Sequence, residues 1–100
     1  MTRNSEGYLP EFSERALVAY ERLSAADKTR VDSVLQDIQS IGLKSRWVTR
    51  MHGPHKIYLA RAGTRLRILF QHGDDVLTIL DIVARDQLDR LTRLYRWNED

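Results

Sequence analysis

Positively charged side chains gather in the middle of this sequence. Seven basic residues and three histidines, but no acid, lie between Lys44 and Gly73. A stretch of this length without a carboxylate produces a local field that attracts phosphate groups. Arginine can hold a phosphate through two parallel hydrogen bonds, and lysine or tyrosine can transfer a proton when neighbouring cations lower its pKa. The segment therefore predicts binding to a polyanion, and RNA is the polyanion that we expect.

The alternation of apolar and polar residues indicates which of these side chains share a face. Successive side chains of a strand point to opposite faces of a sheet. If Leu66, Ile68 and Phe70 pack on helices, the opposite face carries Lys56, Tyr58, Arg65, Arg67, Asp81 and Arg85. Such a cluster could bind a phosphodiester and stabilise the charge that develops on it during cleavage. The alternative is that these are ordinary solvated charges on the exposed face of an antiparallel sheet.

Other side chains near this cluster are candidates for RNA contacts or for proton transfer. His52 and His55 could donate a proton, because a histidine titrates near neutrality, or they could be exposed loop residues. Asp81 is the acid on the predicted face, and we expect it to orient Arg65 or Arg67, since a carboxylate among cations is a weak base. The residues that we expect to bind RNA are Arg50, His52, His55, Arg61 and Arg67.

The elements that position these residues follow from the spacing of the apolar side chains. A helical period occupies residues 14–23 and, after a second capping serine, the segment up to Gly42. After a basic connection at 44–54, the period changes to two in strands at 56–62, 65–72 and 76–84, which glycine-containing turns separate. A first strand at 8–12 belongs at a sheet edge because it contains Pro10, and a last helix is expected at 86–97. The sequence predicts an α+β fold of order βααβββα, with an N-terminal strand and a helical hairpin on one face of a small antiparallel sheet.

Length and composition are typical of a small globular protein. The 100 residues suffice for a single domain, 1–100, and 42% hydrophobic with 30% charged residues is the composition of a folded chain. The absence of cysteine excludes a disulfide framework, a cysteine zinc site and a thiol nucleophile. Without a signal peptide or an apolar run of about 18 residues, we expect no membrane contact and a cytoplasmic protein. Because the basic face has no close pair of carboxylates, we also expect neither a metal nor a cofactor.

Three segments together resemble the RelE/ParE family of bacterial toxins. They read FSERALVAYERL at 12–23, KIYLARAGTRLRILF at 56–70 and VLTILDIVAR at 76–85. The resemblance covers residues 8 to 85, and it rests on the order and spacing of the motifs. The family fold is a small sheet with an N-terminal helical hairpin packed on one face, as the periodicity also predicts.

The resemblance implies a function and assigns roles to single residues. RelE-like members are metal-independent endoribonucleases that cleave mRNA, often on the ribosome, and a cognate antitoxin inhibits them. By resemblance, Lys56, Arg65 and Arg85 are catalytic, with Tyr58 at a position where some members have a second lysine. The implied reaction is attack of the ribose 2′-hydroxyl on the adjacent phosphate, which yields a cyclic phosphate. We expect the toxin to be a monomer when it is alone. The alternatives are a ParE-like inhibitor of DNA gyrase and an RNA-binding member without turnover.

Overall fold

The computed structural model describes residues 9–45, 47–52, 56–73, 76–88, 90 and 98–99. Its main helices lie near the N-terminus, and most of its strands follow them in the sequence. The helices are α1 (Glu14–Glu21), α2 (Ala25–Ile41) and the short 3-10 helix η1 (Gly42–Lys44). The strands are β1 (Leu9–Phe12), β2 (Val48–His52), β3 (Tyr58–Ala62), β4 (Leu66–His72), β5 (Val76–Ala84) and β6 (Asn98–Glu99). Residues 85–88 and 90 are also helical, whereas most of the helix expected at 86–97 lies outside the described residues.

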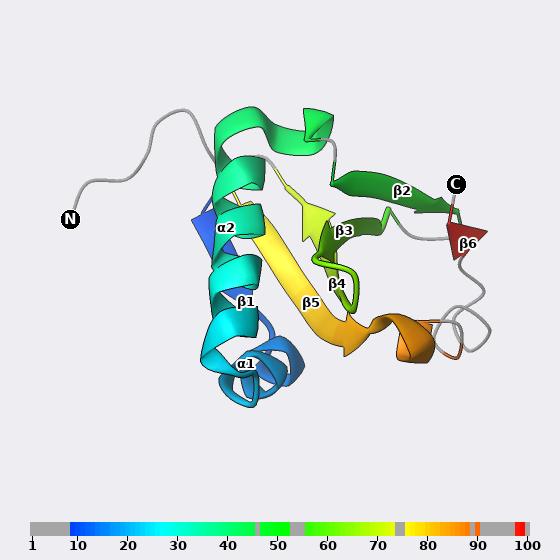
Figure 1. Cartoon of the computed structure of the whole chain (residues 1–100). Coiled ribbons are helices and arrows are strands. Elements are labelled where there is room, and N and C mark those ends of the chain that lie inside the picture. The colour runs from blue at the N-terminus through cyan, green and yellow to red at the C-terminus, as the bar shows by residue number, and fades with distance from the viewer. Residues whose placement is uncertain are drawn as a thin grey trace.

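The strands form one sheet in the order β1-β5-β4-β3-β2-β6. β1 runs parallel to β5, and the pairs β2-β3, β3-β4, β4-β5 and β2-β6 are antiparallel. Pro10 therefore lies in an edge strand, as its missing N–H requires. Figure 1 shows β2 and β6 extending away from the helices. The predicted α+β class and the helical hairpin on one face are confirmed, whereas the segment expected to be a basic connection contains strand β2.

Local interactions set the limits of the two helices. The side chains of Ser13 and Ser24 accept hydrogen bonds from the backbone N–H groups of Ala16 and Asp27, three residues further on. Both serines therefore satisfy backbone donors that the first turn of a helix leaves without partners. Gly42 ends α2 with a φ of 65°, a left-handed conformation that glycine adopts without a steric penalty.

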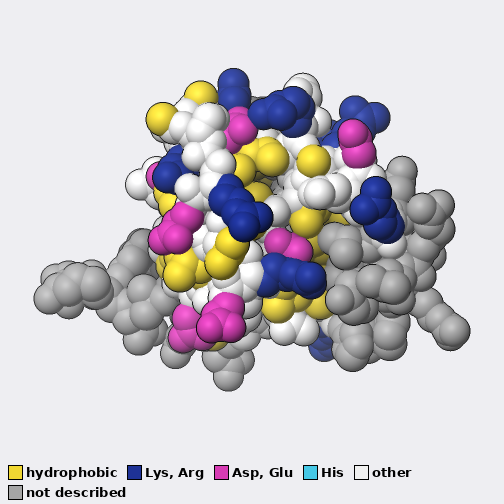
Figure 2. All heavy atoms as spheres, turned by 90° about the horizontal axis from the view of Figure 1, so that it is seen from below, with side chains coloured by type: hydrophobic (Ala, Val, Ile, Leu, Met, Phe, Trp, Pro, Cys, Tyr) yellow, Lys and Arg dark blue, Asp and Glu magenta, His cyan; other side chains and the backbone are white. Residues whose placement is uncertain are grey.

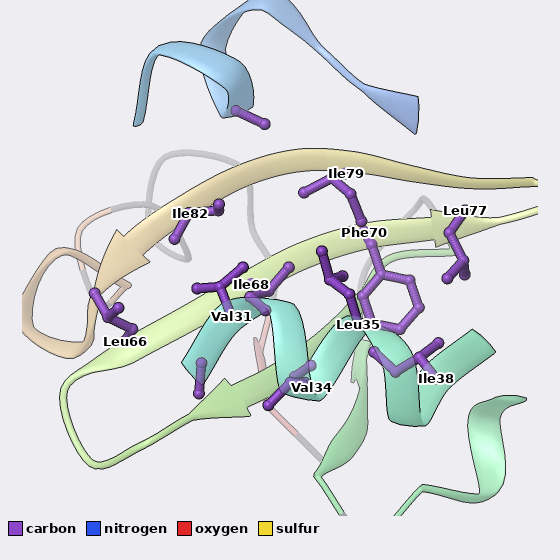
Figure 3. Packing of buried hydrophobic residues seen from close by; sticks show 13 residues of the cluster. Val31, Val34, Leu35, Ile38, Leu66, Ile68, Phe70, Leu77, Ile79 and Ile82 are labelled. Atoms are coloured by element: carbon purple, nitrogen blue, oxygen red, sulfur yellow. The ribbon is translucent and has the colours of Figure 1, made fainter. Parts of the chain in front are cut away.

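A large apolar core fills the space between the helices and the sheet. Phe70 of β4 is fully buried, and Figure 3 shows Leu35 and Ile38 of α2 directed toward its ring. The buried members of this first core are Ala16, Val31, Val34, Leu35, Ile38, Ala60, Ala62, Leu66, Ile68, Phe70, Leu77, Ile79 and Ile82. Burial of this apolar surface is the main force that holds α2 against the sheet.

A second, smaller core covers the opposite face of the sheet. Its buried members are Met51, Ile57, Leu59, Leu69, Val83 and Leu88. Leu59 and Leu69 alternate with first-core residues along β3 and β4, so the two cores lie on opposite faces. The alternative of an exposed, solvated face therefore does not hold for the centre of this sheet, where Leu59 and Leu69 are buried in a cluster with Leu88.

An irregularity in β5 changes which residues face the helices. Leu69 pairs with Asp81 but Phe70 pairs with Ile79, so Leu80 is an extra residue in β5. Such a bulge shifts the alternation of side chains by one position. A simple alternation would put Ile79, Asp81 and Val83 on one face, but Ile79 belongs to the first core and Val83 to the second.

Candidate phosphate-binding site

The hairpin of β3 and β4 carries most of the candidate residues. Its turn contains Gly63 and Thr64, and Gly63 has a φ of 76°, a conformation that residues with a Cβ rarely adopt. Arg61 and Arg67 are paired directly across the two strands. Directly opposed cations repel one another, so this arrangement favours an anion between or beside them.

Arginines from three places line a pocket of about 440 Å³ at this end of the sheet. Its lining residues are Val34, Trp47, Arg61, Gly63, Thr64, Arg67 and Arg85. None of these described lining residues is acidic. Guanidinium groups, the Thr64 hydroxyl and an indole ring are suited to a nucleotide, because they can bind a phosphate and stack on a base.

Arg67 is more buried than the sequence suggested. It is only 9% exposed, and its Nη1 donates to the backbone carbonyl of Leu66 at 2.9 Å and to those of Gly63 and Thr64 at 3.4 Å. The guanidinium therefore stabilises the turn in addition to supplying positive charge to the pocket. Arg61, by contrast, is exposed.

Arg65 lies in the same turn, and its side chain is directed toward α2. Its Nη2 contacts Oδ2 of Asp27 in α2 at 2.8 Å, and both residues line a hollow of about 250 Å³ that shares Gly63 and Thr64 with the larger pocket. The backbone N–H of Arg85 donates to the carbonyl of Arg65 at 2.7 Å. The structure thus brings the backbones of Arg65 and Arg85 together, but Arg65 does not share the face of Arg67.

The remaining residues predicted to be catalytic lie apart from this pocket. Lys56 is exposed just before β3 and is not among the described residues that line either hollow. Tyr58 faces the helices rather than the arginines: it packs against the first core, and its ring stacks on Phe70 at a centroid distance of 5.6 Å. The placement of Tyr58 beside Arg67 was therefore wrong.

The predicted RNA-binding residues of β2 and the following segment are only partly described. Arg50 is exposed in β2, opposite Tyr58 in β3. His52 ends β2, and its side chain lies outside the described part of the structure, as does all of His55. Both histidines remain expectations from the sequence.

Asp81 does not orient Arg65 or Arg67 as expected. Its Oδ2 lies 3.7 Å from Nε of Arg15 in α1, and its Oδ1 accepts a 2.8 Å hydrogen bond from the backbone N–H of Ile82. Burial raises the pKa of the Asp81 carboxyl above its ordinary value, although the Ile82 N–H and Arg15 oppose this effect. The carboxylate that holds Arg65 is Asp27. No local signal in the sequence indicates this contact, because Asp27 lies in the first turn of α2, where an acid already stabilises the helix.

Asp81 also borders a hollow of about 1000 Å³ beside α1. Leu17 and Val18 of α1 line it and are 47% and 49% exposed. Figure 2 shows apolar, basic and acidic side chains close together on this face. The basic side chains that line the hollow are Arg15, Arg22 and Arg90.

Among the described residues, no group of three or more His, Asp or Glu side chains is placed to hold a metal ion. Across the same part of the chain, no helix is long and apolar enough to cross a membrane.

The fold, a helical hairpin packed on a mostly antiparallel sheet, is similar to that of chains in solved structures. One match is a chain of the archaeal RelE-RelB complex from Pyrococcus horikoshii OT3, with a TM-score of 0.66 and 18% identity, over 79% of this chain and 96% of that one. Another is a chain of the toxin-antitoxin complex RelBE2 from Mycobacterium tuberculosis, with a TM-score of 0.65 and 19% identity, over 79% and 99%. No protein-family model and no curated protein matches the sequence. The chain therefore shares the fold of these chains from a RelE-RelB and a RelBE2 complex.

Proposed function

We propose that this protein is the toxin of a toxin-antitoxin pair and acts as a metal-independent endoribonuclease on mRNA, in the cytoplasm and in association with the ribosome. The observation that carries the proposal is the pocket in which Arg61, Arg67 and Arg85 converge, with no acid among the described lining residues. The fold supports it, because the two similar structures named above are a RelE-RelB complex and a toxin-antitoxin complex. A cognate antitoxin is the protein partner that this proposal requires.

In the proposed reaction, the 2′-hydroxyl oxygen of a ribose attacks the adjacent phosphorus, and the bond to the 5′-oxygen of the next nucleotide breaks. One proton leaves the 2′-hydroxyl and one is added to the 5′-oxygen, so the products are a 2′,3′-cyclic phosphate and a 5′-hydroxyl. Arg61 and Arg85 bind the phosphates of the RNA, and the charge of Arg67 adds to their field. Arg65 stabilises the negative charge that builds up on the phosphate oxygens. Lys56 is the proposed proton-transfer group, with His52 and His55 as alternatives.

The first test is cleavage of a labelled mRNA by the purified protein, with and without ribosomes and in the presence of EDTA. We expect new ends that carry a cyclic phosphate, and we expect Arg65→Ala, Arg85→Ala and Lys56→Ala to cleave much more slowly than the wild type. Arg22→Ala is the matched control, because Arg22 is an exposed arginine directly after α1 and outside the arginine pocket. Cleavage that stops in EDTA without ribosomes, or equal loss in the control, would contradict the proposed chemistry.

A second candidate function is inhibition of DNA gyrase through a helical surface. The observation in its favour is the apolar exposure of Leu17 and Val18 beside the hollow of about 1000 Å³. A supercoiling assay separates the two functions. Inhibition that Leu17→Asp abolishes and Arg65→Ala leaves unchanged would favour gyrase, whereas RNA cleavage with the opposite pattern favours the nuclease.

A further inference from the structure

Asp27 is a buried carboxylate that binds two arginines at once. The residue is 7% exposed, its Oδ1 lies 2.9 Å from Nη1 of Arg30, and its Oδ2 lies 2.8 Å from Nη2 of Arg65. Arg30 is one turn away on the same helix, but Arg65 is separated from Asp27 by 38 residues of sequence. The contact with Arg65 therefore connects the start of α2 to the turn between β3 and β4.

The position of the Asp27 side chain is set by the elements around it. Its backbone N–H donates to the capping hydroxyl of Ser24 at 3.1 Å, which places Asp27 in the first turn of α2. The helix in turn packs on the sheet through Val31 and Leu35 of the first core. The Asp27 side chain is thus held in place, whereas the Arg65 side chain is 73% exposed and would sample several rotamers without this contact.

The turn approaches the helix closely at a second place. A Cβ added to Gly63 would lie 3.0 Å from Cδ of Arg30, closer than ordinary side-chain contacts. Gly63 therefore permits Arg30 to lie against the turn while Arg30 also contacts Asp27. The three residues Asp27, Arg30 and Arg65 hold this turn against the start of α2.

We infer that Asp27 is a positioning residue for Arg65, an inference that rests on the proposed ribonuclease function. The ion pair uses Nη2 of Arg65, and a guanidinium has further donors on Nε and Nη1 with which it can bind a phosphate oxygen. Orientation is a better account of this pair than stability, because solvent screens an ion pair whose arginine is so exposed. Asp27 holds the guanidinium at the edge of the turn, beside the backbone of Arg85, in the orientation that the transition state requires.

The test compares four purified variants with the wild type in single-turnover RNA cleavage. Asp27→Asn keeps the size of the side chain and removes its charge. Asp37→Asn makes the same change on α2 at a residue that lines neither the arginine pocket nor the hollow at Arg65. Arg65→Ala and the double variant Asp27→Asn/Arg65→Ala complete a cycle that shows whether Asp27 acts through Arg65. Circular dichroism melts identify the temperatures at which all variants are folded.

We expect Asp27→Asn to reduce the cleavage rate constant on the order of 10-fold, with a smaller effect on RNA affinity. Asp37→Asn should cleave like the wild type, and the double variant should be no slower than Arg65→Ala alone. An unchanged rate in Asp27→Asn, or an effect that multiplies that of Arg65→Ala, overturns the inference.

A second measurement does not depend on catalysis. NMR relaxation of the Nε–Hε group of Arg65 should show a lower order parameter in Asp27→Asn than in the wild type or in Asp37→Asn. Equal order parameters overturn the inference even if the protein cleaves RNA. If the order parameter falls but the wild type does not cleave RNA, the contact is established and the proposed function is the part that fails.

Discussion

The hydroxyl of Ser13 donates a 2.8 Å hydrogen bond to the backbone carbonyl of Leu80, the extra residue in β5. The same oxygen accepts a hydrogen bond from the backbone N–H of Ala16 at 3.0 Å, and the backbone N–H of Ser13 donates to the backbone carbonyl of Ile79 at 2.9 Å. One serine therefore ends β1, caps α1 and binds the bulge. The bulge in turn directs Asp81 toward α1 and Ile82 into the first core.

Replacing Ser13 by alanine should lower the free energy of unfolding by about 1–2 kcal/mol, because both the helix cap and the bond to Leu80 are lost. Urea unfolding followed by circular dichroism measures this change. Ser33→Ala is the control, since Ser33 is a solvent-exposed residue in the middle of α2, and this substitution should be neutral or slightly stabilising. A loss no larger in Ser13→Ala than in Ser33→Ala would show that the bulge does not depend on the hydroxyl.

Alanine at Gly63 should destabilise the protein by about 1 kcal/mol or more, because the φ of 76° is strained for any residue with a Cβ and the new methyl group meets Arg30. Gly73→Ala provides a comparison, since the nearest side-chain atom there, Cγ1 of Val76, is 3.4 Å from the added Cβ. The urea midpoints of both variants and of the wild type measure the loss of stability. Equal midpoints would argue against a close approach of Arg30 to the turn.

Asp81 should make the folded state less stable as the pH rises. Burial raises the pKa of its carboxyl above the ordinary value of 3.8, so the folded chain binds this proton more tightly than the unfolded chain. Its contribution is therefore fully present below pH 3.8 and is lost as the pH passes through the raised pKa. Unfolding free energies of the wild type and of Asp81→Asn, measured from pH 3 to pH 8, should diverge in favour of the variant. A difference that does not change with pH would contradict this prediction.

Tyr58→Phe separates the packing of this residue from the catalytic role that the family resemblance implies. The ring should still stack on Phe70, so the melting temperature should change little. Because the ring packs on the helices and lies apart from the arginine pocket, the RNA cleavage rate should stay close to that of the wild type. Tyr20→Phe is the matched control, because it removes a hydroxyl that donates to Asp32 on the helices. A cleavage rate that falls about 100-fold or more in Tyr58→Phe, but not in Tyr20→Phe, would contradict a packing role alone.

The arginine pocket predicts how RNA binding responds to salt. Each phosphate contact that is lost should make the slope of log K against log salt concentration less steep by about 0.7 for single-stranded RNA. We expect this change in Arg61→Gln, which alters an exposed side chain of the pocket. Arg22→Gln should bind with the slope of the wild type. Titrations of a fluorescent RNA at several salt concentrations measure both, and equal slopes for the two variants would place the RNA elsewhere.

Most of the fold could be predicted from local patterns. Ser13 and Ser24 cap helices as expected, Pro10 lies at an edge, and Gly63 occupies the turn between two strands. These features depend on a few neighbouring residues, so the sequence carries them directly. The faces of β5 could not be predicted, because the extra residue Leu80 is recognised only in its pairing with β4.

The sequence by itself determined that this protein is an α+β domain with a cluster of arginines around one hairpin. Tertiary structure alone decided which arginines meet: Arg61, Arg67 and Arg85 share a pocket, whereas Arg65 turns to Asp27. It also decided that Tyr58 packs on the helix side of the sheet and that Asp81 contacts Arg15. The physical reason is that an ion pair or a stacked ring depends on distances of a few ångströms between segments tens of residues apart. Local periodicity carries no information about those distances.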